Sequence, residues 1–280
     1  MIESTTTGQA KVVQVEIEGA VMIVTLIRPP ANAIDTATST ALYEAFSRLN
    51  EDDSLRVGIL IGGANPKKIF SAGWDLKAVA RGEGRDEEQG FDLGPGGIGG
   101  LPEYFDLYKP VIAAVNGAAI GGGFEMVLGA DIIVASEDAY FALPEMKRGF
   151  LPDGGAIQKL HHRVPFNVAM DLMLTGRRLS AAEAKHWGLV RDVVPEDRIL
   201  DHARALARGI AEGAPLVTRA LKEYMRFNAF TSPEQAHKAT RRAWIGKSGL
   251  VNYEKMLQSE DFNEVAVAFA EKRDALFRGA

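Results

Sequence analysis

The sequence predicts an α/β fold with largely parallel strands, and three observations support this. Short, continuous apolar runs that suit buried strands recur at residues 57–61, 111–115 and 132–135. Glycine-bearing helical segments alternate with these runs, as they do in sheets whose parallel strands are joined by helices. The chain has 280 residues, near the upper limit for one hydrophobic core, so we expect one large domain with a smaller appendage.

The N-terminal segment predicts a β-hairpin followed by a helix. Residues 12–18 alternate apolar and polar side chains, residues 20–27 are rich in Val, Ile and Met, and Glu18-Gly19 lies between the two runs. After the break at Arg28-Pro29-Pro30, Asp35 and Thr36 offer N-cap chemistry for a helix that runs to about residue 49. One face of this helix would carry Leu42, Phe46 and Leu49.

Two later regions differ from this pattern. Residues 82–100 are first charged and then glycine-rich, and a loop of this length in a compact domain is usually functional or mobile. From about residue 200 the strand signals end. We therefore expect a core over residues 1–204 and a helical region over 205–280. The helices expected in the latter part of the chain are 200–212, 215–229, 233–245 and 261–277.

Composition excludes several classes of function. The net charge of -5 and the pI of about 5.7 disfavour binding to nucleic acid or to anionic membranes, so an anionic ligand would need a local cluster of Lys and Arg. The chain has no cysteine, which excludes disulfides, thiolate catalysis and cysteine-based zinc sites. The first ten residues lack a secretory pattern and no apolar run reaches membrane length, so a soluble, cytoplasmic protein is expected.

Two tempting motifs fail on context. Gly94 to Gly99 fits G-x-G-x-x-G, but no apolar strand precedes it and no clear helix follows, so we do not expect a dinucleotide site. The pair His161-His162 is more typical of a solvated helix end than of a metal site, and no metal is expected.

The most informative stretch runs from residue 109 to residue 154. Gly121, Gly122 and Gly123 follow the apolar run 111–115 and lead into an apolar helix. Glycines at such a turn let the backbone approach a ligand and leave N–H groups at a helix N-terminus. Tight helix–strand packing would also explain one glycine, but three in succession favour a ligand.

Two glutamates in this stretch are candidate catalytic groups. Glu125 lies among apolar neighbours on the expected helix, so its carboxylate is either salt-bridged or has a raised pKa. Glu145 follows the run 140–144, where a strand finishes. Taken singly, each is more often a surface or paired carboxylate.

A second candidate segment is FSAGWDLK, residues 70–77, just after the apolar run 57–61. Its small residues bring backbone close to a ligand. Lys67, Lys68 and Lys77 bracket the segment and would suit phosphates, although a solvated loop with scattered lysines explains them equally well.

Together these segments resemble the crotonase superfamily (enoyl-CoA hydratase/isomerase) over nearly the whole chain. The resemblance implies a spiral of β-β-α units with a C-terminal helical region that builds homotrimers, often paired into hexamers. The matching segments are FSAGWDLK (70–77), KPVIAAVNGAAIGGGFE (109–125), FALPE (141–145), Leu151-Pro152, TGRRLSAAEAKHWGLV (175–190) and AFAEKRDALFRG (268–279).

The resemblance also implies roles for individual residues. The backbone N–H groups of Trp74 and Gly122 would form an oxyanion hole, and Glu125 and Glu145 would be the catalytic carboxylates. Coenzyme A would be bound as part of the substrate, with no separate cofactor. Its contacts would come from Lys68, Ala72, Asp75, Leu76 and Lys77, and from Phe269 and Lys272 of a neighbouring subunit.

Within the superfamily the chain most resembles the branch that dehydrates carnitinyl-CoA, on Trp74, the FDLGPGG loop at 91–97 and FALPE. Many hydratases carry glycine where this chain has Asp153. Asp153 would either add a third carboxylate near the reacting water or, as we expect, N-cap a helix that begins at Gly154.

The implied activity is reversible addition of water to a 2-enoyl-CoA, with Glu125 activating water and Glu145 supplying the Cα proton. The alternative is a general short-chain enoyl-CoA hydratase of fatty-acid β-oxidation. Other superfamily reactions and a non-catalytic RNA binder are less consistent with the two glutamates and the acidic charge. Trp74, Phe91, Tyr104 and Phe105 could give cation–π contacts to a trimethylammonium substrate, assisted by Asp92 or Glu103. The alternative for the Trp74 ring is that it only packs in the core.

Overall fold

The computed structural model describes residues 12–86 and 90–280, with the backbone alone at residues 85, 86, 90 and 91. Its centre is a six-stranded sheet in the order β1-β2-β4-β9-β11-β14. These strands are β1 (Val13–Glu18), β2 (Val21–Leu26), β4 (Val57–Gly62), β9 (Val111–Val115), β11 (Ile132–Ser136) and β14 (Asp192–Val194). β1 and β2 pair antiparallel and every other pair is parallel, which confirms the predicted hairpin and the predicted parallel strands.

A second sheet has the strand order β13-β12-β10-β5. Along the chain, its strands are interspersed with those of the first sheet. β10 pairs parallel with both β5 and β12, so the carboxyl ends of these three strands meet at one edge. Its strands are β5 (Ile69–Ser71), β10 (Ala118–Ile120), β12 (Tyr140–Ala142) and β13 (Leu179–Ser180). Two small ladders join β3 (Ala33–Ile34) to β6 (Gly73–Trp74) and β7 (Arg85–Asp86) to β8 (Gly90–Phe91).

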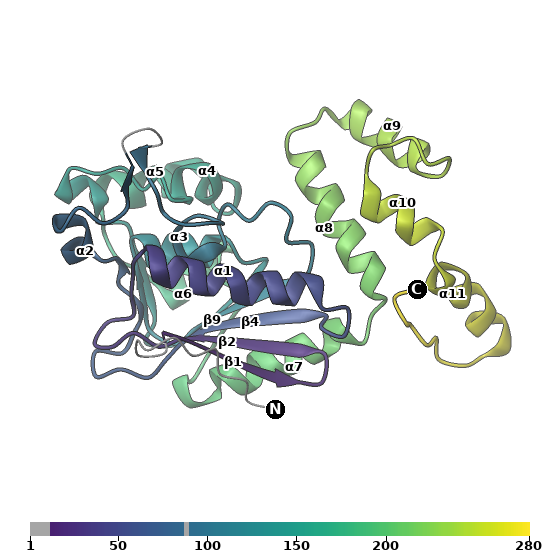
Figure 1. Cartoon of the computed structure of the whole chain (residues 1–280), viewed down its shortest axis with the longest axis horizontal. Helices are drawn as coiled ribbons and strands as arrows, with labels where there is room; N and C mark the ends of the chain where they lie inside the picture. The colour runs from purple at the N-terminus through teal and green to yellow at the C-terminus, as the bar shows by residue number, and fades with distance from the viewer. Residues whose placement is uncertain (1–11, 87–89) are drawn as a thin grey trace.

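Helices cover both faces of the large sheet (Figure 1). α1 (Thr36–Glu51) begins where the Asp35 side chain accepts a hydrogen bond from the Thr38 N–H, which confirms the predicted cap. Its Leu42, Phe46 and Leu49 are fully buried, also as predicted. On the opposite face, α7 (Ile199–Ala211) packs Ile199, Ala203 and Ala207 against the strands.

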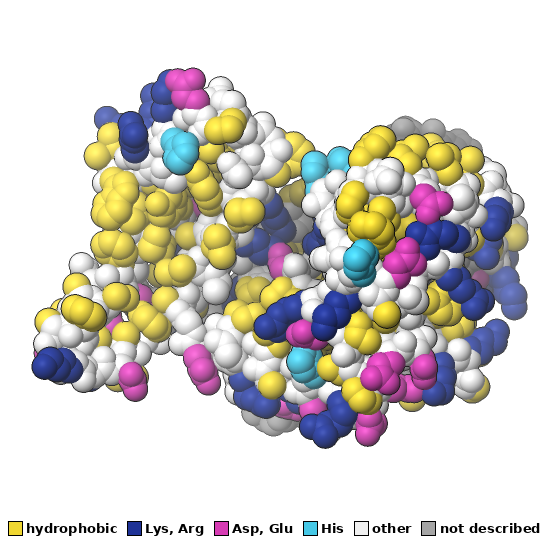
Figure 2. Space-filling view, turned by 180° about the vertical axis from the view of Figure 1, so that it is seen from behind, with side chains coloured by type: hydrophobic (Ala, Val, Ile, Leu, Met, Phe, Trp, Pro, Cys, Tyr) yellow, Lys and Arg dark blue, Asp and Glu magenta, His cyan; other side chains and the backbone are white. Residues whose placement is uncertain are grey.

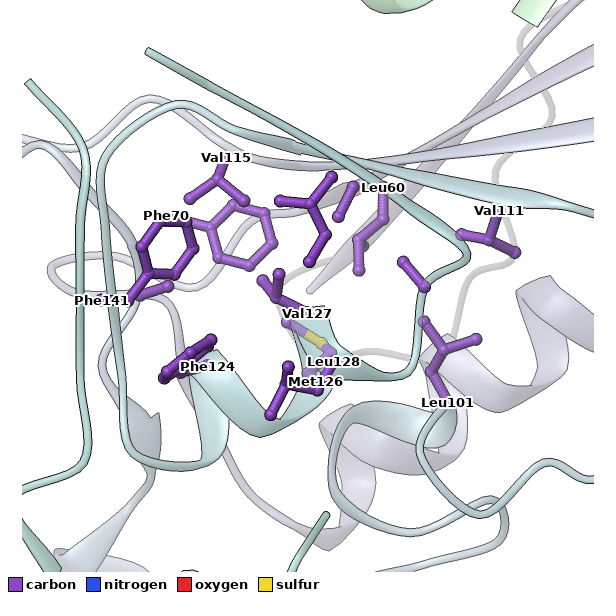
Figure 3. Close-up of a cluster of buried hydrophobic side chains, with 14 of the residues drawn as sticks. Leu60, Phe70, Leu101, Val111, Val115, Phe124, Met126, Val127, Leu128 and Phe141 are labelled. Carbon is purple, nitrogen blue, oxygen red and sulfur yellow. The ribbon is translucent and has the colours of Figure 1, made fainter. Parts of the chain in front are cut away.

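The main core fills the space between the two sheets and the helix α3 (Gly122–Leu128). Figure 3 shows Phe70, Phe124 and Phe141 meeting there, one from each of β5, α3 and β12. The rings of Phe124 and Phe141 lie 5.0 Å apart. This apolar cluster fixes α3 against the edge where β5, β10 and β12 end.

The remaining helices of the core are short. They are α2 (Leu76–Ala80), α4 (Ala156–Lys159), α5 (Phe166–Thr175) and α6 (Ala181–His186), with the 3-10 turns η1 (Ile98–Gly100), η2 (Glu145–Arg148), η3 (Leu160–His162) and η4 (Glu196–Arg198). The glycine-rich segment that fits G-x-G-x-x-G ends in η1 rather than entering an α-helix. Its context is therefore not that of a dinucleotide-binding turn.

After α7 the chain leaves the body and forms a separate group of helices (Figure 1). They are α8 (Pro215–Ala229), α9 (Pro233–Ala243), α10 (Val251–Leu257) and α11 (Glu260–Glu271). α7 spans the predicted division at 204/205, and that division stays a prediction. The helix predicted over 261–277 was wrong at its end, because Lys272 takes a left-handed conformation (φ 55°) and stops α11; α10 was not predicted.

No helix in the described parts of the chain combines the length and apolar character needed to cross a membrane.

Candidate active site

The strand ends of the second sheet bring the candidate residues together. β5 leads through Ala72 into Gly73-Trp74, β10 leads into the glycines before α3, and β12 leads into Pro144-Glu145. The Gly121 N–H donates to the Ala142 carbonyl at 2.8 Å, which ties two of these segments directly. Segments that lie far apart in the sequence therefore meet at the N-terminus of α3.

Glu125 lies on the first turn of α3 and is 4% exposed. Its Oε1 accepts a hydrogen bond from the Ala156 N–H at 3.1 Å. Burial raises the pKa of Glu125 to about 8; the charges of Glu145 and Asp153 act in the same direction, and backbone N–H donors oppose it. Of the two alternatives predicted for this residue, the structure favours the raised pKa, because Glu125 is buried and forms no salt bridge in the described parts of the chain.

Glu145 begins η2 and is half-buried beside the same helix end. Burial raises its pKa, helped by the charge of Asp153 and opposed by its own backbone N–H and by Arg148. Its Oε2 is buried, and no donor in the described parts of the chain reaches it. The site thus holds two carboxyl groups whose charged forms are both disfavoured.

The three glycines before and within α3 serve different purposes. A Cβ on Gly121, which has φ 55°, would lie 2.5 Å from Glu145 Oε1, so glycine here admits the carboxylate. A Cβ on Gly122 would lie 1.9 Å from Ile98 Cδ1. A Cβ on Gly123 would lie 2.4 Å from the Ser71 carbonyl oxygen, which is a packing constraint. Two of the three therefore face the candidate site, and the third explains helix–strand packing.

The backbone of Trp74 lies next to Gly122. A Cβ on Gly122 would be 3.3 Å from the Trp74 nitrogen, and a Cβ on Gly73 would be 2.7 Å from the Gly122 nitrogen. As the first residue of α3, Gly122 has an N–H that the helix itself leaves without an acceptor. Two backbone nitrogens from separate segments thus meet beside the two glutamates.

Asp153 does not cap a helix, so that prediction was wrong. α4 begins at Ala156, two residues later than expected. Its N-cap residue is Gly155, so no side chain caps this helix. The Ala156 N–H donates instead to the buried carboxyl of Glu125 on α3. Asp153 is exposed next to Gly154, whose Cβ would lie 3.1 Å from Glu125 Oε2.

Comparisons with known proteins show the family of this chain. Residues 16–280 match the family model described as Enoyl-CoA hydratase/isomerase. The chain belongs to the enoyl-CoA hydratase/isomerase family. A relative named carnitinyl-CoA dehydratase from Salmonella paratyphi A is 48% identical over 261 residues, which is 93% of this chain and 96% of the relative. A relative of the same name from Salmonella agona has the same identity and coverage.

Solved structures of the family confirm the predicted crotonase-type fold. An enoyl-CoA hydratase from Mycobacterium tuberculosis superposes with a TM-score of 0.82 at 37% identity, over 96% of this chain and 99% of that one. An enoyl-CoA hydratase from Mycobacterium marinum gives a TM-score of 0.83 at 37% identity, with the same coverage.

The residues that the family suggests for coenzyme A fall into two groups, one over residues 68–77 and the other formed by Phe269 and Lys272. Ala72, Asp75, Leu76 and Lys77 follow β5 directly, beside the site; Leu76 and Lys77 are exposed. Asp75 caps α2 by accepting from the Lys77 N–H at 3.0 Å and pairs with Arg28 at 2.9 Å, so its carboxylate orders this turn.

Lys68 lies at the start of the same region. Its side chain is exposed and pairs with Glu196 at 2.7 Å, so it would have to exchange this partner for a phosphate. Phe269 lies on α11 and Lys272 directly follows it, at the opposite end of the molecule from α2 (Figure 1). Phe269 is 86% exposed. Within one chain, the structure does not bring these two groups together.

The suggested cation–π residues are only partly available. Tyr104 stacks on Tyr43 of α1 with ring centres 4.7 Å apart, so its ring belongs to the packing of that helix. Phe105 is 66% exposed, and the Trp74 ring packs partly buried on the main core. The side chain of Phe91 lies outside the described residues.

One site residue was missed in the sequence. Ile98 is 3% exposed and contacts the positions of both Gly122 and Gly154. The signal for it was weak: it is a single aliphatic residue among the glycines of residues 94–100, and only the fold shows that this segment packs against α3.

Proposed function

We propose that this protein catalyses the reversible addition of water to a 2-enoyl-CoA and that its acyl substrate is carnitinyl-CoA, dehydrated to crotonobetainyl-CoA. One observation carries the reaction type: two buried or half-buried carboxyl groups, Glu125 and Glu145, flank two adjacent backbone nitrogens at the start of α3. The acyl group is supported by the name of relatives that are 48% identical over 93% of the chain.

The backbone nitrogens serve the thioester oxygen. As water adds to Cβ, negative charge develops on this oxygen and an enolate forms. The N–H groups of Trp74 and Gly122 donate to it, and a donor of this kind typically contributes about 3 kcal/mol to the transition state. Their positions are set by β6 and α3 before substrate arrives, so little reorganisation is needed.

The two glutamates handle the protons. Glu125 activates the water that attacks Cβ, and Glu145 supplies the proton that Cα receives. These roles need Glu125 ionised and Glu145 protonated, whereas burial places the resting proton on Glu125, whose pKa is about 8. The pair acts as one titrating unit. A water held between the two carboxyls relays the proton from Glu125 to Glu145, after which the ionised Glu125 takes a proton from the attacking water.

Coenzyme A enters as part of the substrate, and the reaction requires no separate cofactor. The exposed Lys68 and Lys77 meet its phosphates, while Ala72, Asp75 and Leu76 form the adjoining wall. Phe269 and Lys272 come from a neighbouring subunit, because α11 of the same chain lies far from α2 (Figure 1).

A homotrimer, alone or paired, is the proposed assembly. The C-terminal helices leave many large apolar side chains exposed, which is typical of an interaction surface. Figure 2 shows hydrophobic side chains gathered over this group of helices. The exposed residues are Val217, Leu221, Met225, Phe230, Trp244, Ile245, Val251, Phe262, Val265, Val267, Phe269 and Leu276.

The alternative is a general short-chain enoyl-CoA hydratase, and substrate comparison separates the two. We expect kcat/KM for hydration of crotonobetainyl-CoA to exceed that for crotonyl-CoA. Equal or faster turnover of crotonyl-CoA would contradict the carnitine assignment and leave the hydratase assignment intact. Absence of turnover with both thioesters would contradict the reaction type itself.

A further inference from the structure

The acyl group proposed above imposes a requirement that the two glutamates do not meet. In crotonobetainyl-CoA the trimethylammonium nitrogen lies two bonds from Cβ, the carbon that water attacks. A site that holds this water between Glu125 and Glu145 therefore holds a permanent cation beside the same carboxyls. This cation has no N–H group, so it is recognised by negative charge or aromatic faces rather than by hydrogen bonds.

The glutamates themselves are poor counter-charges. Glu125 is buried and holds the resting proton. In the proposed mechanism both carboxyls bind the reacting water. Arg148 lies near enough to Glu145 to lower its pKa, so it also adds positive charge beside the cation. A further carboxylate is needed at this end of the site.

Asp153 has the required position. It directly precedes Gly154, whose Cβ would lie 3.1 Å from Glu125 Oε2 and 3.0 Å from Ile98 Cγ2. Its negative charge also helps to raise the pKa of Glu125 and of Glu145, which agrees with this position beside Gly154.

The Asp153 carboxylate also has no structural role in the described parts of the chain. Asp153 caps no helix, and among residues 12–86 and 90–280 no Lys or Arg forms an ion pair with its carboxylate; only its backbone carbonyl accepts, from Gln158. The other acidic candidates differ. Asp92 accepts the Gly94 N–H at 2.7 Å and so shapes its own turn, and Glu103 lies against Gly97.

We propose that Asp153 is the carboxylate that binds the quaternary ammonium group of the acyl chain and thereby selects a cationic over a neutral enoyl-CoA. This inference rests on the proposed function for the identity of the acyl group. It adds a specificity-determining residue with no role in proton transfer. The ammonium group replaces the missing Lys or Arg as the partner of Asp153, while Arg148 balances Glu145.

The test separates charge from shape by comparing two substrates. Crotonobetainyl-CoA is measured against 5,5-dimethylhex-2-enoyl-CoA, in which a neutral tert-butyl group replaces the trimethylammonium group. The variants are Asp153→Asn, which removes the charge, and Asp153→Glu, which keeps it. Asp201→Asn, on an exposed position of α7, is the matched control for the change in net charge.

With wild type we expect a higher kcat/KM for the cationic substrate. Asp153→Asn should lower kcat/KM for the cationic substrate by about 10- to 100-fold, mainly through KM, and leave the neutral one within about twofold. Asp153→Glu should restore part of the preference, and Asp201→Asn should preserve all of it. The effect should shrink as salt is added if Asp153 is exposed when substrate binds.

Three results decide between the possibilities. If wild type prefers the cation and Asp153→Asn keeps that preference, the inference about Asp153 is wrong and the proposed function stands. If Asp153→Asn lowers kcat/KM equally for both substrates and shifts both pH profiles, Asp153 only changes the pKa values of the glutamates. The inference is again wrong in that case. If wild type itself shows no preference for the cation, the proposed substrate fails. Should Asp153→Asn not fold, Asp153→Gly replaces it, because it also removes the charge.

Discussion

Replacing Glu125 with Gln is expected to stabilise the protein while it inactivates the enzyme, and the gain should grow with pH. The pKa of Glu125 rises from 4.5 to about 8 in the fold, chiefly because the carboxyl is buried. The native state therefore binds a proton that the unfolded chain has already released between these two pH values. The unfolding free energy contributed by this group is fully present below pH 4.5 and is lost as pH rises through about 8.

The magnitude follows from the size of the pKa rise. At about 1.36 kcal/mol per pKa unit, the wild type loses up to about 5 kcal/mol from this group on going from pH 4.5 to above pH 8. Gln has nearly the same shape, can accept the Ala156 N–H through its carbonyl oxygen, and does not ionise. The stability advantage of Glu125→Gln over wild type should thus be near zero at pH 5 and reach about 2–5 kcal/mol at pH 9.

Urea unfolding of both proteins at pH 5, 7 and 9 measures this difference, at one protein concentration because assembly also affects apparent stability. Titrating groups that do not interact with Glu125 cancel in the comparison. Glu145→Gln is the matched control, and its advantage should be smaller because Glu145 is less buried. A difference between wild type and Glu125→Gln that stays constant from pH 5 to pH 9 would refute the claim that Glu125 holds the resting proton.

Three further predictions test other parts of the molecule. Gly122→Ala should lower kcat by about 10²–10³-fold, because its Cβ would lie 1.9 Å from Ile98 Cδ1 and displace a backbone donor; adding Ile98→Ala should recover part of the loss in the same steady-state assay. Asp131→Ala should lower the unfolding free energy by about 3 kcal/mol in urea titration, because it leaves the Lys222 ammonium, 2.7 Å away, without its carboxylate partner. Lys77→Ala should raise KM for the CoA thioester but not for the matching pantetheine thioester, which lacks the nucleotide phosphates; equal effects on both would exclude a phosphate contact.

Much of the fold follows from local pattern. The hairpin, α1 with its Asp35 cap, and the buried strands over residues 57–61, 111–115 and 132–135 carry signals within a few residues of themselves. Their hydrophobic period and cap chemistry do not depend on what packs against them. The motifs that the family resemblance placed in order also singled out Glu125 and Glu145, which lie at the same helix end, while their catalytic roles stay a prediction.

The errors arise where a distant segment decides the local structure. The sequence predicts Asp153 as an N-cap, but the Ala156 N–H donates to Glu125, which lies 31 residues earlier in the chain. The last helix reads as continuous to residue 277, but it stops at Lys272, where Arg273 turns back to pair with Glu264 at 2.5 Å. Ile98 becomes part of the site only because its loop packs on α3. None of these contacts has a local signal in the sequence.

The central claim is that Glu125 and Glu145 together add water to an enoyl-CoA. The most direct test is kcat/KM for hydration of crotonobetainyl-CoA by Glu125→Gln and Glu145→Gln beside wild type, followed by loss of the ultraviolet absorbance of the conjugated thioester. Each variant should lose about 10²–10⁴-fold, because each glutamate transfers a proton in the reaction. Near-normal hydration by both variants would contradict the account.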